Sequence, residues 1–474
     1  MGQTATKKNN PNIVLIMSDD QGWGETGYNG HPVLKTPILD EMARTGLNMS
    51  RFYAASPVCT PTRVSCMTGR HANRSGAFSW NWSTRPEEIT ISQLLKNFGY
   101  STGHFGKWHI GAIKEGSPVS PKALGFDENV SHDNFFEMNP LLSKNGGEPQ
   151  VYEGEGSEVI VAEAMKFIEQ SKKDGKPFFV VIWFGSPHAP YSGTEEDVKL
   201  YEQYGNTISR RFAEITAMDR AIGQFRDKLT QLGERSNTLI WFNSDNGIPK
   251  STEFTQKERE YYYNGSFRGY KGDLTEGGLR VPAIIEWPAV IDSPIESNYP
   301  CVTSDILPTI LEILKIDVPV ERPMDGISIL PVINGEKITV RNKPIGSWVY
   351  PFKNELINEP WIKNSALNNM ITFTANNKDP EAKNEFGNKR NFVNYKHPEV
   401  LKEPFFGRAT WIDNNYKLIV YNNRKRELYN LRTDIGEVYD ISKANNNILE
   451  RMSQELKEWQ VSVENSLAGK DYKN

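Results

Sequence analysis

The chain has 474 residues, and its 55 Lys and Arg against 59 Asp and Glu give a formal net charge of −4. This near-balance excludes a protein that holds nucleic acid or a membrane surface through a large excess of positive charge. Hydrophobic residues make up 38% of the chain, which excludes disorder and predicts a large core. The three cysteines, Cys59, Cys66 and Cys301, are too few for a disulfide framework.

We expect no membrane span, because the longest apolar run, Phe178–Phe184, is too short to cross a bilayer. The amino-terminal residues MGQTATKKNN contain no apolar stretch of the kind found in export signals. Gly2 and Thr6 fit the loose pattern for myristoylation. A start codon in front of a trimmed mature sequence explains these residues better, so we expect that an export signal has been removed.

Short apolar runs alternate with segments of helical period, a pattern typical of βαβ units on a largely parallel sheet. Strands are expected at Asn12–Met17, Tyr100–Phe105, Pro177–Phe184, Thr238–Asn243 and Val281–Trp287. Helices are expected at Pro37–Arg44, Ile91–Phe98, Glu158–Lys172, Ser209–Leu232 and Ser304–Lys315. We assign this α/β domain to residues 10–335.

The pattern changes after about residue 335. Residues 350–405 are rich in Asn, Lys and Pro and show no sustained period. Two alternating strands, Arg408–Trp411 and Tyr416–Tyr421, are joined by a turn, and short sheet elements are expected within Arg426–Asp440. An amphipathic helix is expected at Ile448–Ser466. Residues 336–474 are therefore predicted to form a smaller antiparallel sheet with one helix, which contributes to the substrate cleft.

Polar side chains follow four of the predicted strands where each strand ends. They are Asp19 and Asp20, Lys107 and His109, His188, and Asp245 and Asn246. Because the carboxyl ends of parallel strands lie at one edge of the sheet, we expect these side chains to share one crevice. Three carboxylates that converge need a cation, since their repulsion otherwise forces protonation, and oxygen ligands favour Ca²⁺ or Mg²⁺. Either acidic pair alone would also fit a helix cap or a plain turn.

Residues Gly22–Gly27 fit the GxGxxG pattern of dinucleotide-binding proteins, with Asp40 at about the expected distance. Two observations oppose this interpretation. Asp19 and Asp20 stand between the strand and the glycines, where they would repel a pyrophosphate. The residues after Gly27 do not begin a helix, and Asp40 falls inside a helical pattern. We therefore do not expect a dehydrogenase.

The segment from Ser56 to Arg70 carries the most specific local pattern. Cys59 or Thr60 as the cap, with Pro61 near the first helical position, predicts a helix amino terminus, where backbone N–H groups favour an anion. Arg63 lies one turn after Cys59 and is expected on the same face. A capped helix with a buried thiol is the alternative, and we assign that role to Cys66.

Cys59-Thr60-Pro61-Thr62-Arg63 followed by Thr68-Gly69-Arg70 resembles the signature of the type I, formylglycine-dependent sulfatases. Other blocks similar to that family occur in the family's order: Asp19-Asp20, Gly106-Lys107-Trp108-His109-Ile110-Gly111, His188, Asp245-Asn246-Gly247, and Lys271 with Glu276–Pro282. The resemblance covers about residues 10–335. It implies an alkaline-phosphatase-like α/β/α sandwich with a large, mostly parallel sheet, and the hydrolysis of sulfate esters.

The resemblance implies that Cys59 is oxidised to formylglycine (3-oxoalanine) by a formylglycine-generating maturation enzyme. The hydrated aldehyde, a geminal diol, would attack sulfur, and the resulting sulfo-enzyme would expel sulfate by returning to the aldehyde. One Ca²⁺ ion, with Mg²⁺ as the alternative, would lower the pKa of the attacking hydroxyl. The implied ligands of this ion are Asp19, Asp20, modified Cys59, Asp245 and Asn246.

The resemblance also implies roles for basic residues. Lys107 and Lys271 would neutralise charge on the transferred group, and Arg63 would orient the diol. His188 is the candidate acid for the leaving alcohol and His109 the candidate base, although the sequence leaves this division open. In an extended segment Lys107 and His109 would point the same way. The glycines around Lys271 suit a loop that approaches a ligand closely, and a solvated basic stretch is the alternative.

Substrate contacts are predicted from aromatic and polar residues. Trp80 and Trp82 follow the Cys59 segment, and aromatic residues recur at Trp348, Tyr350, Phe352 and Trp361. Such rings suit stacking on sugars, and packing at the domain seam is the alternative. His132 lies where some family members carry a further substrate contact, and a surface loop is the alternative. We expect a sulfated oligo- or polysaccharide as substrate and no nucleic-acid partner.

A polysaccharide enzyme would be periplasmic or secreted, and a lysosomal location is the alternative. Three other functions stay open at this point: an arylsulfatase of small substrates, a phosphate or phosphonate ester hydrolase of the same superfamily, and a non-catalytic, calcium-dependent sugar-binding protein. Comparing the rates of sulfate and phosphate release from matched aryl esters distinguishes a sulfatase from a phosphate or phosphonate ester hydrolase. Binding of a sugar without turnover would identify the sugar-binding protein.

Overall fold

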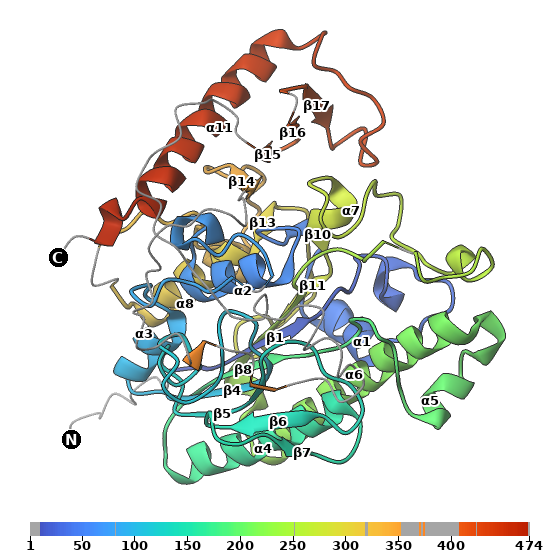
Figure 1. The fold of residues 1–474 in the computed structure, drawn as a ribbon, viewed down its shortest axis with the longest axis vertical. Helices are drawn as coiled ribbons and strands as arrows, with labels where there is room; N and C mark the ends of the chain where they lie inside the picture. Colours follow the sequence, from blue (N-terminus) through green and yellow to red (C-terminus); the bar gives the residue numbers. More distant parts are fainter. Residues whose placement is uncertain are drawn as a thin grey trace.

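The computed structural model describes residues 10–80, 82–250, 252–317, 321–351, 369–370, 373–374, 407–422 and 424–472. Within this part of the chain, ten strands form the main sheet (Figure 1). In spatial order they are β12 (Ile295–Ser297), β2 (Leu47–Met49), β11 (Ala283–Glu286), β9 (Thr238–Ser244), β1 (Asn12–Ser18), β8 (Phe178–Trp183), β4 (Ser101–Lys107), β5 (Glu128–His132), β6 (Leu141–Lys144) and β7 (Gln150–Val151).

The centre of the sheet, β9-β1-β8-β4-β5, is parallel. Its strands are buried on both faces, which explains why β8 reads FFVVIW without a polar residue. Strand β11 runs antiparallel to β9 at the side of this parallel block. The parallel centre places the ends of β1, β4, β8 and β9 along one edge, as the sequence predicted.

Helices cover both faces of the sheet, as Figure 1 shows. Alternate residues of β1 belong to two separate cores: Leu15 packs on the side of α2 (Cys59–Thr68), α3 (Ile91–Asn97) and α8 (Ile306–Leu314), and Ile16 on the side of α1 (Pro37–Thr45), α4 (Gly156–Lys173) and α6 (Asn206–Gln231). Shorter helices are α5 (Glu195–Lys199), α7 (Glu276–Leu279) and α9 (Leu330–Ile333). The predicted α/β/α sandwich is confirmed.

A second sheet lies near the carboxyl terminus. Its antiparallel order is β14 (Ile345–Val349), β15 (Arg408–Asp413), β16 (Tyr416–Val420) and β17 (Arg426–Asn430). Helix α11 (Asn446–Leu467) covers it through residues three or four positions apart, including Met452 and Leu456, which pack with Leu418 (Figure 1). The predicted smaller antiparallel sheet with one helix is therefore confirmed.

Several details differ from the sequence-based prediction. The strand expected at Val281–Trp287 is divided at Pro282, which has no N–H to donate. Its first part, β10 (Arg280–Val281), joins β3 (Phe52–Tyr53) and β13 (Cys301–Val302) in a small third sheet, while β11 joins the main sheet. Eight of the described strands were not predicted: β2, β3, β5, β6, β7, β12, β13 and β14. Within Arg426–Asp440, only Arg426–Asn430 is a strand.

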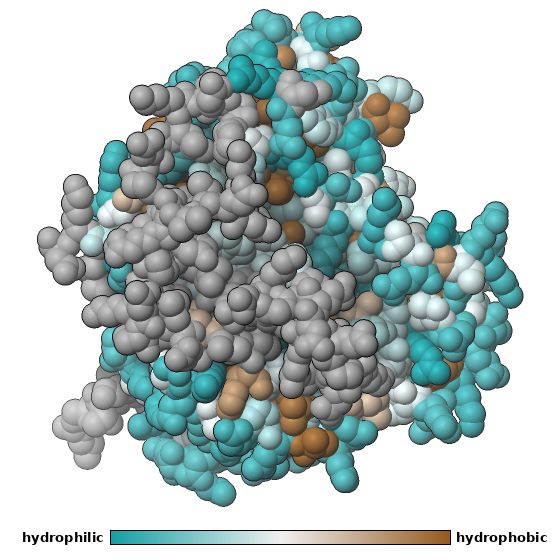
Figure 2. Space-filling view, in the orientation of Figure 1, coloured by the Kyte–Doolittle hydropathy of each residue, from teal (hydrophilic) through white to brown (hydrophobic). Residues whose placement is uncertain are grey.

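No helix in the described part of the chain combines the length and apolarity that a bilayer crossing requires. Figure 2 shows one face of the molecule, on whose coloured part hydrophilic residues predominate and apolar residues are scattered singly or in small groups. The large apolar residues are concentrated inside, where tryptophans 108, 183 and 241 are fully buried. Packing of such side chains makes the sheet a rigid support for the residues at its edge.

Candidate functional site

The ends of β1, β8 and β9 meet at the edge that the sequence predicted. Ser18 and Ser244 are register partners, and the backbone N–H of Asp245 donates to the carbonyl of Ser18 at 3.1 Å. The N–H of Asp19 donates to the carbonyl of Ser186, just before His188, at 3.0 Å. The backbone therefore fixes the two acidic segments and the histidine segment beside one another.

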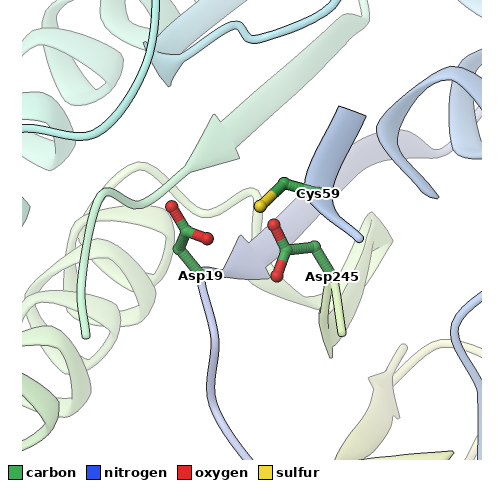
Figure 3. Close-up of side chains that lie close together, drawn as sticks. All are labelled: Asp19, Cys59 and Asp245. Atoms are coloured by element: carbon green, nitrogen blue, oxygen red, sulfur yellow. The ribbon is translucent and has the colours of Figure 1, made fainter. Parts of the chain in front are cut away.

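Asp19, Cys59 and Asp245 lie together at the centre of this edge (Figure 3). One carboxylate oxygen from each aspartate and the Cys59 sulfur lie within 4.8 Å of one another, and all three residues are buried. A second group combines Asp19, Asp20 and His188. The structure thus brings together the acidic residues that the sequence placed on separate strands.

This donor set fits a hard cation. Within the described part of the chain, neither Asp19 Oδ1 nor Asn246 Oδ1 has a hydrogen-bond partner, although both atoms are buried. Burial and the nearby Asp19 carboxylate raise the pKa of Asp245 to about 6, against the opposing effect of Arg63. Buried oxygens without partners and crowded negative charge are what a bound Ca²⁺ or Mg²⁺ would relieve.

Each carboxylate also forms a close ion pair with a lysine or arginine side chain. Nζ of Lys107 lies 2.5 Å from Asp19 Oδ2, and Nζ of Lys271 lies 2.6 Å from Asp20 Oδ1. Nη2 of Arg63 lies 2.7 Å from Asp245 Oδ2. Three negative and three positive charges balance, so a divalent cation would leave the site positive. The completed site is therefore suited to an anionic group.

Cys59 is the first residue of α2 and is 2% exposed. The predicted cap was wrong: Val58 is the N-cap, and its hydrocarbon side chain cannot accept a hydrogen bond. Thr60 lies inside the helix and donates its hydroxyl to the carbonyl of His109 at 2.7 Å. Burial raises the pKa of Cys59 to about 12, although Lys107 and Lys271 oppose the shift. The unmodified thiol is thus protonated and a poor nucleophile at neutral pH.

The segment around Lys271 is structural as well as charged. The N–H of Lys271 donates to the carbonyl of Ile248 at 2.8 Å, and the N–H of Gly272 donates to that of Pro57 at 2.9 Å. A Cβ on Gly247 would lie 2.0 Å from the carbonyl oxygen of Gly277, so this close approach requires glycine. The segment therefore joins the Asn246 turn to the Cys59 segment, and it is not a solvated basic stretch.

The two candidate catalytic histidines are held differently. The His188 ring stacks on Phe135 with centroids 4.4 Å apart, and its Nδ1 is 2.5 Å from the carbonyl of Ala189. Nε2 is thus the free ring nitrogen of the neutral form, 3.6 Å from Asp20 Oδ2. Burial lowers the pKa of His188 to about 3, with Asp20 opposing and Lys271 adding to the shift.

His109 is buried just beyond β4, and burial together with the Lys107 and Arg63 charges holds its pKa well below the usual range. Its backbone φ is +52°, so the segment is not extended at this residue. The expectation that Lys107 and His109 point the same way assumed an extended segment, and this assumption does not hold at His109. The bond from Thr60 nevertheless holds the His109 backbone beside the start of α2.

The residues predicted to contact substrate occupy different environments. His132 is the register partner of Lys107 on β5, and its Nδ1 accepts the N–H of Asn134 at 3.0 Å. Trp82 is 8% exposed and packs in an apolar cluster with Trp348, whereas Trp80 is 45% exposed. Tyr350 belongs to the same cluster as Trp82, and Phe352 and Trp361 lie outside the described residues. A substrate role for His132, Trp80 and Trp82 stays a prediction.

The glycine-rich segment after β1 has a structural role. Asp40 Oδ1 accepts the N–H of Tyr28 and the hydroxyl of Thr36, at 2.8 and 2.9 Å. Glu25 forms a buried ion pair with Arg211 of α6. This pair was not predicted from the sequence, because Arg211 stands in an ordinary helical pattern. The available signal was a glutamate among glycines, which could have indicated a buried charge in need of a partner.

The family model described as Sulfatase matches residues 11–316. N-acetylgalactosamine-6-sulfatase of Mus musculus is 30% identical over 363 residues, which cover 68% of this chain and 66% of that protein. Steryl-sulfatase of Rattus norvegicus is 27% identical over 416 residues, which cover 69% of this chain and 70% of that protein. The chain thus spans about two thirds of the length of these curated relatives.

Solved structures extend the likeness to nearly the whole chain. The crystal structure of Ps i-CgsB in complex with k-i-k-neocarrahexaose is 24% identical, with a TM-score of 0.77, and the match covers 97% of this chain and 94% of that one. At this identity the likeness shows the fold alone. Because the family model matches more than half of the residues of this chain, the chain belongs to the sulfatase family of sulfuric ester hydrolases.

Proposed function

We propose that this protein removes sulfate from a sulfated carbohydrate at the site around Cys59. The observation that carries the proposal is the meeting of Cys59 with Asp19 and Asp245, each carboxylate being paired with a basic side chain. An anionic sulfate group would be drawn to this site once a divalent cation is bound there. The family to which the chain belongs supports sulfate as the group that is released.

We further propose that Cys59 is converted to formylglycine by a maturation enzyme. The high pKa of the thiol, about 12, supports this because the unmodified residue would be an ineffective nucleophile. Formylglycine at this position would supply a hydroxyl nucleophile in its hydrated form. Its place as the first residue of α2 directs it toward Asp19 and Asp245, as Figure 3 shows for the cysteine.

The carboxylates of Asp19, Asp20 and Asp245 and the amide oxygen of Asn246 would hold the cation, for which we propose Ca²⁺ rather than Mg²⁺. A bound divalent cation supplies charge stabilisation and lowers the pKa of a hydroxyl beside it. The buried oxygens of Asp19 and Asn246 that accept no hydrogen bond within the described part of the chain support this assignment. Flexible coordination by several protein oxygens suits calcium better than the strict octahedron of magnesium.

Lys107 and Lys271 would bind the sulfuryl oxygens and neutralise the charge that accumulates on them. Both ammonium groups already lie at the site, bonded to Asp19 and Asp20. Once a cation takes over part of the negative charge of these carboxylates, the ammonium groups can turn to the substrate anion. Arg63 would keep Asp245 and the residue at position 59 in place, since it donates to Asp245 through both Nε and Nη2.

His188 and His109 are proposed to transfer protons. His188 would protonate the leaving alcohol, because its Nε2 faces the site while its Nδ1 is held by Ala189. Binding of an anionic ester would raise the pKa of His188 above about 3, since opposite charge favours the protonated ring. His109 would accept a proton from the residue at position 59. The effect of the leaving group on the His188→Ala and His109→Ala variants tests this assignment of roles.

The carbohydrate class is proposed from the names of similar proteins. One relative is named for N-acetylgalactosamine 6-sulfate, and Ps i-CgsB was crystallised with a neocarrahexaose, an oligosaccharide by its name. Steryl-sulfatase is similar as well, so a small aryl or alkyl sulfate is the second candidate. A carbohydrate substrate would fit the expected periplasmic or secreted location, with the lysosome as the alternative. That location and the domain division after residue 335 stay predictions.

The test measures free sulfate released from a panel of sulfated oligosaccharides and from a matched pair of aryl sulfate and aryl phosphate. The protein is produced with a formylglycine-generating enzyme, and Cys59→Ala serves as the control. The proposal expects sulfate release from at least one saccharide and a strong preference for sulfate over phosphate. Phosphate release that exceeds sulfate release, or a Cys59→Ala protein of full activity, would overturn it.

A further inference from the structure

We propose that Arg211 and Glu25 are positioning residues that set the placement of Asp20 relative to His188. The inference rests on the proposed function, because it concerns the cation ligand Asp20 and the proton donor His188. In the described part of the chain, the side-chain hydrogen bonds of Arg211 and Glu25 go to each other, to backbone groups and to Tyr191, and none goes to a proposed sulfate-binding side chain. They act through the backbone of the two segments that carry the reacting side chains.

Arg211 is fully buried in α6, and each of its five N–H groups has an acceptor. Nε and Nη2 donate to the two carboxylate oxygens of Glu25, both at 2.6 Å. Nη2 also donates to the carbonyl oxygen of Asp20 at 2.7 Å. Nη1 donates to the carbonyl oxygen of Pro187 at 2.7 Å and to the hydroxyl of Tyr191 at 3.3 Å.

These bonds join two segments that are far apart in sequence. Asp20 follows β1, and Pro187 follows β8 and directly precedes His188. Glu25 adds a third attachment, because its Oε2 accepts the N–H of Gly22 at 2.8 Å. A single planar guanidinium therefore holds both backbones. The distance of 3.6 Å between His188 Nε2 and Asp20 Oδ2 thus depends on the position of the Arg211 guanidinium.

Two properties make this arrangement specific to arginine. A guanidinium presents its donors in a fixed plane, whereas an ammonium has three rotatable donors on a flexible stem. Lysine at position 211 could keep the charge and a bond to Glu25 but could not hold both carbonyl oxygens. The ring of Tyr191 lies 5.3 Å from the guanidinium carbon and that of Tyr262 lies 5.5 Å from it, which also suits arginine.

The test compares Arg211→Lys and Glu25→Gln with Arg341→Lys. Arg341 is a matched control, because it is buried and pairs with both oxygens of Asp305 at 2.7 and 2.8 Å. In the described part of the chain, its other side-chain hydrogen bonds go to the carbonyl groups of Pro300 and Lys343, which lie outside the site. Three quantities are measured: kcat and KM for sulfate release, Ca²⁺ affinity by calorimetry without substrate, and the unfolding temperature. The enzyme used is the full chain.

Arg211→Lys is expected to weaken Ca²⁺ binding by about 10–100-fold, the range found for residues that orient metal ligands. It should lower kcat by at least about tenfold with a smaller change in KM, and Glu25→Gln should act in the same direction. Arg341→Lys should lower the unfolding temperature but leave kcat and Ca²⁺ affinity unchanged. Because the calorimetric measurement needs no turnover, it decides the inference even if sulfate release is not observed.

The proposal is overturned if Arg211→Lys and Glu25→Gln retain wild-type kcat and Ca²⁺ affinity. It is also overturned if Arg341→Lys changes both quantities as much as they do, since the effect would then reflect general destabilisation. Should Arg211→Lys fail to fold, Glu25→Gln decides the question, because a single amide oxygen in the place of Oε2 can still accept from Nη2 of Arg211 and from the N–H of Gly22.

Discussion

Replacing Lys107 by Met removes a cation from the centre of the site while keeping a side chain of similar length. Nζ of Lys107 is fully buried and 2.5 Å from Asp19 Oδ2, and the next cation, Nη2 of Arg63, lies 3.9 Å from Asp19 Oδ1. The substitution therefore leaves a buried carboxylate whose nearest remaining positive charge lies more than 1 Å farther away. The variant Lys107→Met thus separates the charge of Lys107 from its packing.

In the absence of metal, breaking such a buried pair is expected to reduce the free energy of unfolding by about 3–5 kcal/mol. Ca²⁺ should restore more stability to Lys107→Met than to the wild type, because Asp19 becomes free to bind the ion without competition from the ammonium. Activity should not recover. The loss of a charge that stabilises the sulfuryl group is expected to lower kcat by about 10²–10³-fold.

The assay combines urea unfolding in chelator and in saturating Ca²⁺ with steady-state sulfate release. Lys417→Met is the matched control: Lys417 is fully buried, and its Nζ lies 2.9 Å from carboxylate oxygens of both Glu276 and Glu437. This control should lose comparable stability, gain nothing extra from Ca²⁺, and keep its kcat. A Lys107→Met protein with wild-type kcat, or with the same Ca²⁺ response as Lys417→Met, would refute the reasoning.

Three further predictions concern the same site. His188→Ala should lower turnover by about 10²–10⁴-fold on esters of poor leaving groups and much less on an aryl sulfate. The loss of turnover in His109→Ala should not depend on the leaving group. If both variants depend on the leaving group equally, the roles assigned to the two histidines are wrong. Chelation should abolish sulfate release and lower the unfolding temperature, and Ca²⁺ should restore both; unchanged release in chelator would exclude a metal role. In unconverted protein at pH 8, a Cys59 thiol with a pKa of about 12 has a thiolate fraction of about 10⁻⁴. Iodoacetamide should therefore leave Cys59 unlabelled until the chain is unfolded. Rapid labelling in the native state would contradict the burial of this thiol.

The regular parts of the fold could be predicted from sequence because their burial leaves a strong pattern. Strand β8 is apolar throughout, and the helix predicted at Pro37–Arg44 extends by one residue to Thr45. The small third sheet could not be predicted, because two-residue strands such as β3 and β13 carry no period. Pro282 was visible in the sequence, but only tertiary structure shows that the strands on its two sides join different sheets.

Asp19, Asp20, Lys107 and Asp245 were predictable because they stand at the ends of predicted strands of one parallel sheet. The roles of Arg63 and Lys271 came from the resemblance to a known family. The start of α2 was less predictable, since Thr60 bonds to the His109 carbonyl instead of capping its own helix. The positive φ of His109 is a property of the folded loop that residue identity does not reveal. Arg211 was missed for a related reason: helical position indicates burial, but it does not indicate which distant carbonyl groups a buried guanidinium meets.

The central claim is that an oxidised residue at position 59 releases sulfate. The most direct measurement is peptide mass spectrometry across Cys59 on a purified preparation whose rate of sulfate release is known. We expect the aldehyde of formylglycine at position 59 and a rate of sulfate release that rises in proportion to the converted fraction. A preparation that releases sulfate at full rate while position 59 is entirely thiol would contradict it.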